Sequence, residues 1–309
     1  MVNGIINVYK EKGFTSFDVV AKLRGIAGQR KIGHTGTLDP DAVGVLPVCL
    51  GNATKLCDML TDKSKEYVAT FVLGITTDTQ DISGTILDTR PVTVTEEQIR
   101  DVVMSFVGAY EQIPPMYSAL KVNGQRLYDL ARQGKEVERQ ARHVEIPSIE
   151  ILSVDMTGKE RPAVEMKVSC SKGTYIRTLC YDIGEKLGCG ATMTELKRTR
   201  VGNFLLKNAY TLSEIEAIRD EGKLSEIVLA SDAVFDELKA FRIQKQAVKY
   251  LSNGNKLFLQ QLESMEEENK NEIKDKEQVR VYNETGVFTA VYEYVASEQC
   301  YKPVKMFFE

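Results

Sequence analysis

The chain has 309 residues, of which 43% are hydrophobic and 27% are charged, a balance typical of a folded protein with a core. It contains no apolar run of the roughly 18 residues that a membrane-spanning helix needs, and its first residues lack the pattern of a signal peptide. We therefore expect a cytoplasmic protein with no membrane segment. Six cysteines without zinc-type spacing and only two histidines disfavour a metal centre, and we expect the cysteines to be reduced and mostly buried.

The net charge of −4 conceals an uneven distribution. Residues 263–277 contain seven acids and three lysines, and the rest of the chain is neutral. We expect this acidic stretch to be solvated and dispensable. Basic residues cluster elsewhere, which permits binding to phosphate groups but does not require it. The clusters are Arg24, Arg30 and Lys31; Arg126, Arg132, Lys135, Arg139 and Arg142; and Lys197, Arg198 and Arg200.

Hydrophobic residues recur with two different periods over residues 1–238. A period of two, clearest in Lys65–Leu73, predicts strands, and a period near 3.6 after a Ser or Thr cap predicts helices. The predicted strands cover residues 4–9, 65–73, 85–88, 143–155 and 163–170, and the predicted helices cover residues 16–24, 53–60, 95–107, 176–187 and 211–220. Because this order is not a regular strand–helix–strand series, we predict an α+β fold with a mixed, largely antiparallel sheet and flanking helices.

A domain boundary is expected near Glu237–Phe241. Beyond it, short strands separated by turn residues predict a small β-barrel over residues 239–309. These strands are expected near residues 257–262, 278–283, 286–294 and 303–308.

The loop over residues 33–44 is rich in glycine and polar side chains and precedes an apolar run. Such a loop on a buried anchor is a common place for an active site. The spacing alone fits a capped turn better, with Asp39 bonding to its own backbone. A phosphatase-type or metal-binding pair of Asp39 and Asp41 is disfavoured, because no strand runs into it and no further oxygen ligands lie nearby in the sequence.

Long motifs, in order from Asn3 to about Leu212, resemble the bacterial tRNA pseudouridine synthase B family. The final 70 or so residues resemble that family's RNA-binding PUA domain only weakly. One departure is Glu11, which follows Lys10 where the family has proline and makes the rigidity of that turn uncertain. The matching stretches are residues 12–16, 33–51, 53–55, 64–67, 73–74, 76–79 with Asp81, 114–121, 173–178 and 196–199.

The resemblance implies the pseudouridine synthase fold and an isomerase that converts uridine to pseudouridine at position 55 in the T-loop of tRNA. Asp39 falls on the family's catalytic aspartate, which attacks C1′ or otherwise assists glycosidic cleavage. Tyr67 matches the tyrosine that stacks on the target uracil and is suspected of moving a proton. Arg177 falls on the family's arginine, and its ion pair would oppose the rise in the pKa of Asp39 that burial under a base would cause.

The resemblance also assigns substrate-binding roles. His34 fills the space beside the flipped nucleotide, and Asp81 contacts it, although a turn acid is an alternative. Tyr175 and Leu196 match apolar walls of the pocket, where core packing is the alternative. An isomerisation needs no metal or cofactor.

An insertion at about residues 115–145 is implied to close on the T-stem-loop, in a monomer without an obligate protein partner. Two other functions stay open. One is an RNA-binding or RNA-folding protein without essential catalysis. The other is a guide-dependent synthase in a ribonucleoprotein, which the insertion disfavours because guided relatives lack it.

Overall fold

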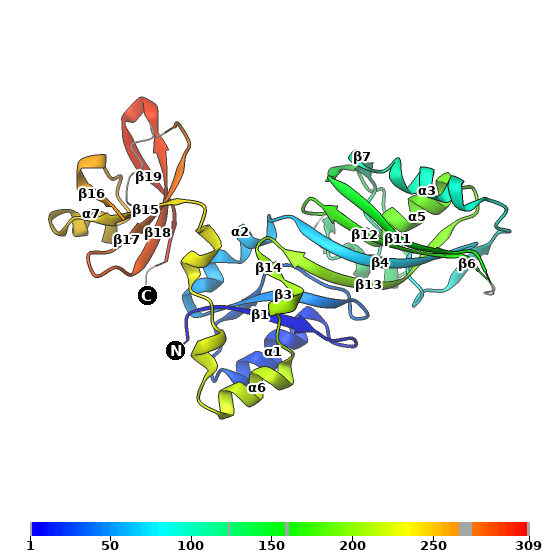
Figure 1. The fold of residues 1–309 in the computed structure, drawn as a ribbon, viewed down its shortest axis with the longest axis horizontal. Helices are drawn as coiled ribbons and strands as arrows, with labels where there is room; N and C mark the ends of the chain where they lie inside the picture. Colours follow the sequence, from blue (N-terminus) through cyan, green and yellow to red (C-terminus); the bar gives the residue numbers. More distant parts are fainter. Residues whose placement is uncertain (1, 123, 158–160, 266–273, 308–309) are drawn as a thin grey trace.

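The computed structural model describes residues 2–122, 124–157, 161–265 and 274–307 (Figure 1). Its centre is an eight-stranded sheet with the order β1-β3-β13-β4-β12-β11, to which β2 and β14 add by pairing with β3 and β13. The pairs are antiparallel except for the parallel pair of β13 and β3, so the predicted mixed, largely antiparallel sheet is confirmed. The strands are β1 (Gly4–Lys10), β2 (Ile32–His34), β3 (Val43–Leu50), β4 (Lys65–Leu73), β11 (Ser148–Asp155), β12 (Ala163–Cys170), β13 (Ala191–Val201) and β14 (Phe204–Leu205).

Strand β13 lies between β3 and β4 in this sheet, and the sequence patterns did not predict it. Charged residues such as Glu195 and Lys197 interrupt its hydrophobic pattern, and the register shifts between Met193 and Glu195 and again between Arg198 and Arg200. Each bulge moves the following side chains to the other face of the sheet, so a simple alternation is lost.

Helices cover the two ends of the sheet (Figure 1). Helices α1 and α6 pack with β1–β3 around Val20 and Leu46, whereas α3 and α5 pack with β4, β12 and β11 around Phe71 and Met166. The predicted starts of three helices are confirmed, because a threonine at each makes a capping box. The helices are α1 (Ser16–Ile26), α3 (Glu96–Met104), α5 (Ile176–Lys186) and α6 (Leu212–Asp220).

Two predicted elements differ in form. The helix expected over residues 53–60 is a 3-10 turn at Gly51–Leu56 followed by the short helix α2 (Cys57–Thr61). The strand expected over residues 143–155 is two strands in different sheets, because Pro147 lacks the N–H that would continue the ladder. These are β10 (Arg142–Ile146), which pairs with β7 (Gly108–Gln112), and β11.

Two small units project from the sheet. A hairpin joins β5 (Ile75–Thr77) to β6 (Ile86–Thr89). The insertion contains the hairpin of β8 (Lys121–Val122) and β9 (Gln125–Arg126) and then helix α4 (Leu127–Arg132).

The C-terminal residues form a separate five-stranded sheet with the order β16-β15-β17-β18-β19 (Figure 1). The expected barrel is not found, because β16 and β19 remain the two edges of the sheet in the described residues. An isolated bridge pairs Tyr301 of β19 with Leu257, which precedes β16 in the chain and is not part of it. The strands are β15 (Lys239–Ile243), β16 (Leu262–Ser264), β17 (Gln278–Tyr282), β18 (Phe288–Val295) and β19 (Cys300–Met306), with a short helix α7 (Val248–Ser252).

An aromatic cluster joins this sheet to the rest of the chain. Phe235, in the connecting segment, lies 5.9 Å from Phe288 and 6.5 Å from Phe307, measured between ring centroids. Their apolar cluster also contains Ile5 and Val45 of the large sheet. Burial of this shared apolar surface stabilises the contact between the two sheets.

Much of the acidic stretch, residues 266–273, lies outside the described residues. The part that is described is not merely solvated. Glu277 forms an ion pair of 2.7 Å with Lys239 on β15, and Asp275 accepts a hydrogen bond of 2.9 Å from the backbone of Ala296.

All six cysteines are free thiols, and Cys57 is the one that is not buried. In the residues that the structure describes, none of the helices is long and apolar enough to cross a membrane.

The close approach of β3 and β13 predicts an effect of Gly44→Ala. Gly44 has φ +109°, and a Cβ there would lie 2.2 Å from the carbonyl oxygen of Arg198. We expect Gly44→Ala to lower the free energy of unfolding by at least about 2 kcal/mol, measured by urea titration. Gly25→Ala in α1 is the matched control, because a methyl group at Gly25 would meet no atom within 4 Å and alanine favours a helix. Equal stability of the two variants would contradict the prediction.

Candidate active site

The loop that follows β2 carries Asp39, and side chains from distant segments hold its backbone. The hydroxyl of Ser16, in the first turn of α1, accepts a hydrogen bond of 2.8 Å from the N–H of Leu38. The ammonium of Lys10, at the end of β1, donates to the carbonyl of Pro40 at 3.0 Å. Asp39 therefore lies between two anchored neighbours, which limits how far its carboxylate can move.

Arg177 brings Asp39 and Asp81 together. It lies in the first turn of α5 and is 6% exposed. Its Nε is 3.0 Å from Oδ2 of Asp39, and its Nη1 is 3.3 Å from Oδ2 of Asp81. A buried guanidinium needs charged or polar partners on several sides, and the two carboxylates provide them.

Backbone carbonyls complete the surroundings of this guanidinium. Nη1 of Arg177 donates to the carbonyl of Thr79 at 3.0 Å, and Nη2 donates to the carbonyl of Tyr117 at 2.9 Å. Tyr117 lies at the start of the insertion. Arg177 thus connects the Asp39 loop, the β5–β6 hairpin and the insertion at one point.

Asp81 is oriented by its own hairpin. Its Oδ1 accepts hydrogen bonds from the hydroxyl of Thr79 at 2.8 Å and from the N–H of Ser83 at 3.1 Å, which leaves Oδ2 toward Arg177. The hairpin also docks on β13, because the N–H of Ile82 donates to the carbonyl of Met193 at 2.9 Å.

Asp39 is the more exposed member of this cluster, and its own pKa is shifted. Its side chain is 39% exposed, against 7% for Arg177, so a ligand can reach the carboxylate. Burial raises the pKa of Asp39, the guanidinium of Arg177 opposes this, and the carboxylate of Asp81 adds to the rise. The result is a reachable carboxylate that binds its proton more tightly than an ordinary aspartate.

Tyr67 and Leu196 lie in the apolar core beside the Asp39 loop. They lie on the neighbouring strands β4 and β13, and both belong to the buried cluster that contains Leu38, the residue before Asp39. Tyr67 is 8% exposed, so both the core and the pocket-wall interpretations fit its position in the free protein. Burial raises the pKa of its phenol, which therefore stays protonated at neutral pH.

Tyr175 and His34 lie at the ends of elements. Tyr175 precedes α5, and the amide of Gln112 in β7 holds its backbone by accepting from its N–H at 2.7 Å and donating to its carbonyl at 3.0 Å. His34 ends β2, and its Nδ1 accepts a hydrogen bond of 3.3 Å from the N–H of Gly36. Burial lowers the pKa of His34, so a neutral ring faces the loop.

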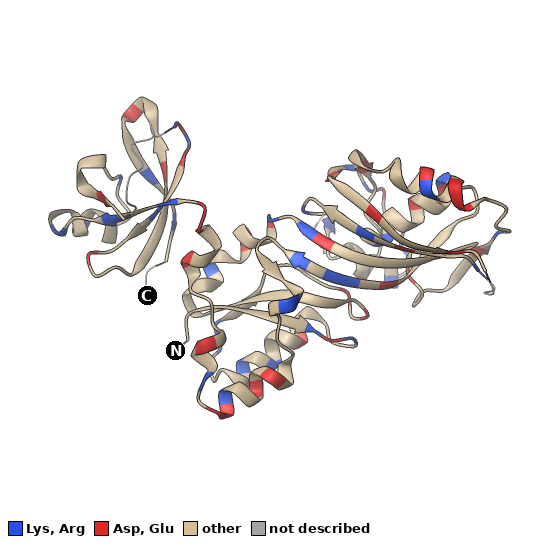
Figure 2. Ribbon diagram, in the orientation of Figure 1, with Lys and Arg blue, Asp and Glu red and all other residues tan. Residues whose placement is uncertain are grey.

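Two basic residues of the sequence are buried in the structure. Arg198, expected in a basic cluster, is 1% exposed and is therefore not part of a surface patch, although Figure 2 shows several Lys and Arg positions along β13. Lys10 is fully buried, and burial lowers its pKa to about 8. Lys10 also donates to the carbonyl of Phe14 at 2.6 Å and to that of Glu11 at 3.2 Å, so the turn is held without the proline.

The sequence signal that could have identified these residues is weak. Lys10 is the last residue of a strand whose other residues are almost all buried. Arg198 lies two residues after the apolar Leu196, in a strand that was not predicted. Within residues 2–122, 124–157, 161–265 and 274–307, no group of three or more His, Cys, Asp or Glu side chains could hold a metal ion.

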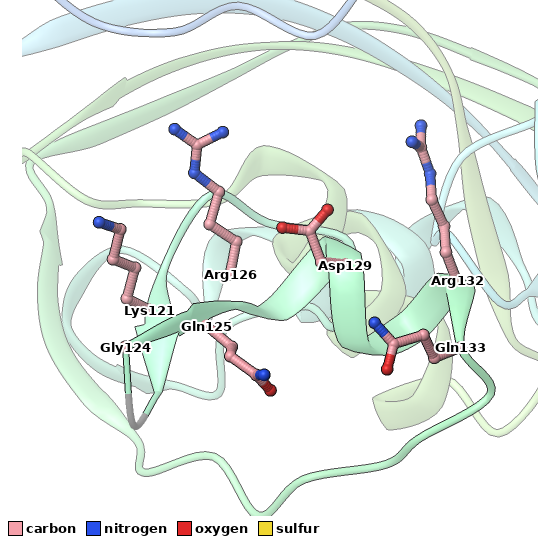
Figure 3. A pocket seen from close by; sticks show the side chains of 7 residues that line it. All are labelled: Lys121, Gly124, Gln125, Arg126, Asp129, Arg132 and Gln133. Carbon is pink, nitrogen blue, oxygen red and sulfur yellow. The ribbon is translucent and has the colours of Figure 1, made fainter.

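The insertion carries a pocket of about 620 Å³. Figure 3 shows that the side chains of Arg126, Asp129 and Arg132 point to the same side, with the carboxylate between the two guanidinium groups. The net positive charge of this lining suits a phosphate group. The pocket is lined by Lys121, Gly124, Gln125, Arg126, Asp129, Arg132 and Gln133.

The ion cluster predicts the effect of removing its cation. In Arg177→Met, Asp39 loses the charge that opposes the effect of burial, so we expect its pKa to rise further. A pH titration of the aspartate carboxyl carbons by NMR measures this shift. In Arg219→Met, on the exposed surface of α6, the titration of Asp39 should not change. An unchanged titration in Arg177→Met would show that the ion pair does not control Asp39.

The comparisons with known proteins point in one direction. A family described as "TruB family pseudouridylate synthase (N terminal domain)" matches residues 24–176, and "tRNA pseudouridylate synthase B C-terminal domain" matches residues 177–236. A protein of Lachnoclostridium phytofermentans named tRNA pseudouridine synthase B is 54% identical and covers 99% of this chain and 100% of its own length. A protein of Clostridium tetani with the same name is 47% identical over 83% of this chain and 86% of its own.

Solved structures agree on the fold. A chain of a Cbf5–Nop10–Gar1 complex is 28% identical with a TM-score of 0.73, and the match covers 99% of this chain and 85% of that chain. A chain of an H/ACA ribonucleoprotein bound to a substrate RNA is 26% identical with a TM-score of 0.72, at the same coverage. This chain therefore belongs to the TruB family of pseudouridine synthases, because it is 54% identical to the first relative over nearly its full length and matches two family domains in succession.

Proposed function

We propose that this pseudouridine synthase acts on uridine 55 in the T-loop of tRNA, with Asp39 as the group that acts at C1′. The observation that carries the proposal is the ion cluster, in which buried Arg177 presents one reachable carboxylate beside the wall of Tyr67 and Leu196. The names of the relatives support tRNA as the substrate.

The reaction requires a group at the sugar and a surface for the base. The N1–C1′ bond breaks, the uracil turns, a C5–C1′ bond forms, and the proton on C5 is lost while N1 gains one. The ionised carboxylate of Asp39 attacks C1′ or stabilises the positive charge that develops there. The sum of these steps is an isomerisation, so no electrons enter or leave.

The target base must leave its stack before this chemistry, at a cost of a few kcal/mol. Stacking on the ring of Tyr67 offsets part of that cost. Tyr175, Leu196 and His34 would line the space around the base and sugar, and Asp81 would hold Arg177 while contacting the nucleotide. The meeting of the Asp39 loop and the β5–β6 hairpin at Arg177 supports the proposal. So does the buried cluster that Tyr67 and Leu196 share with Leu38.

The insertion at about residues 115–145 supplies the grip on the T-stem-loop. The basic pocket of Lys121, Arg126 and Arg132 would receive a backbone phosphate (Figure 3). The direct bond from Arg177 to the carbonyl of Tyr117 supports a link between RNA binding at the insertion and the catalytic carboxylate.

We further propose a catalytic domain of residues 1–238 and a PUA-like RNA-binding domain of residues 239–309, whose five strands fit a small RNA-binding module. The protein is proposed to act in the cytoplasm as a monomer without an obligate protein partner. The basic insertion supports recognition of tRNA by the chain itself.

Replacement of Asp39 tests the function. We expect the purified protein to release tritium from tRNA labelled at C5 of uridine, and Asp39→Ala to lower the rate by roughly a thousandfold or more. Asp41→Ala is the matched control, because Asp41 lies two residues further on the same loop and is exposed. An equal loss of tritium-release rate in Asp39→Ala and Asp41→Ala would refute the role of Asp39. A wild-type protein that is inactive on every tRNA would refute the proposed function.

The raised pKa of Asp39 predicts a pH dependence. Only the ionised carboxylate can act at C1′, so the rate should fall as the pH drops through this pKa. Because burial places that pKa above the ordinary value of about 3.9, the loss should begin at a higher pH than for an exposed aspartate. Single-turnover rates at saturating tRNA between pH 4 and 8, roughly the range over which such groups titrate, measure the profile. A flat profile down to the lowest pH would contradict the assignment.

A further inference from the structure

Arg198 is a buried cation that bonds to the backbone around the active site. Its Nε donates to the carbonyl of Val45 in β3 at 2.7 Å. Its Nη2 and Nη1 donate to the carbonyls of Gly36 and Thr37, in the Asp39 loop, at 3.3 Å and 3.4 Å. The short bond anchors the guanidinium to the sheet, and the two longer bonds reach from that anchor to the loop.

The same residue lies beside the tyrosine of the site. Arg198 on β13 is the direct cross-strand partner of Tyr67 on β4. Residues opposite each other on neighbouring strands have Cβ atoms about 5 Å apart and side chains on the same face. The positive charge of Arg198 acts to lower the pKa of Tyr67, against the larger effect of burial, which raises it.

On the other side of β13, Arg198 lies opposite a glycine of β3, which has no side chain to separate the two backbones. Its partner in the parallel pairing with β3 is Gly44, where a Cβ would lie 2.2 Å from the Arg198 carbonyl. This close approach brings the backbones of β3 and β13 together. The guanidinium therefore bonds to the Asp39 loop beyond β3 while its residue lies directly opposite Tyr67 on β4.

We propose that Arg198 is a positioning residue that sets the Asp39 loop and the Tyr67 hydroxyl relative to each other for the pseudouridine synthase reaction. It acts through backbone carbonyls and the phenol and does not touch the reacting atoms. The inference rests on the proposed function and extends it beyond the cluster of Arg177.

An arginine suits this task better than a lysine. Its planar guanidinium carries five donors that point in fixed, different directions, and the carbonyls of Val45, Gly36 and Thr37 accept three of them. Lysine could keep the charge and satisfy part of the set from a single nitrogen. We therefore expect partial function from Arg198→Lys and much less from Arg198→Met.

The experiment compares binding with chemistry. Single-turnover tritium release at saturating tRNA should slow by about a hundredfold in Arg198→Met, since a small displacement of catalytic groups has effects of that size. The dissociation constant for tRNA should remain that of the wild type, and Arg198→Lys should recover part of the rate. Arg219→Met, on exposed α6, should keep both values. Rates are corrected for the folded fraction, measured by thermal melting.

A double-mutant cycle separates positioning from a general loss of stability. If Arg198 acts through the tyrosine, the rate losses of Arg198→Lys and Tyr67→Phe should be less than additive. This cycle also keeps the proposal testable if Arg198→Met does not fold. Fully additive losses, a wild-type rate in Arg198→Lys and Arg198→Met, or a loss confined to tRNA affinity would each overturn the proposal. A wild-type protein that is active on tRNA in the same assay shows that such a failure concerns Arg198 and not the proposed function.

Discussion

The need to compensate one buried guanidinium organises the site. Arg177 is held away from water, where an unpaired charge would be strongly unfavourable, so it requires acceptors on several sides. Asp39, Asp81 and two backbone carbonyls from distant segments supply them. Asp39 is the more exposed of the two acidic partners, so in this ion cluster it is the carboxylate that a ligand reaches most easily.

The sheet provides the rigidity that this cluster needs. The parallel pairing of β3 with β13 brings the Asp39 loop beside the strand that carries Leu196 and Arg198. Antiparallel pairing of β13 with β4 then places Tyr67 across from Arg198. Backbone hydrogen bonds between these strands thereby fix Tyr67, Leu196 and Arg198 relative to one another, rather than flexible surface contacts.

Local signals made part of the fold predictable. Strand Lys65–Leu73 alternates in burial along its whole length, and threonine capping boxes mark helix starts, because these properties depend on neighbouring residues. Strand β13 was missed because bulges and charged residues break its pattern. The C-terminal strands were partly found, yet their closure into a barrel depends on pairing between residues far apart in the sequence, and the edges did not join.

The sequence by itself determined the family, through motifs that singled out Asp39, Tyr67 and Arg177, since the order and spacing of residue types are properties of the chain alone. Only the tertiary structure decided which charges are buried and what they contact. In the sequence, Arg198 cannot be told from an arginine on the surface. In the structure, its strand β13 lies between β3 and β4, and its side chain is shielded from water. Burial and contact depend on strand order, and that order arises from long-range pairing that no local pattern specifies.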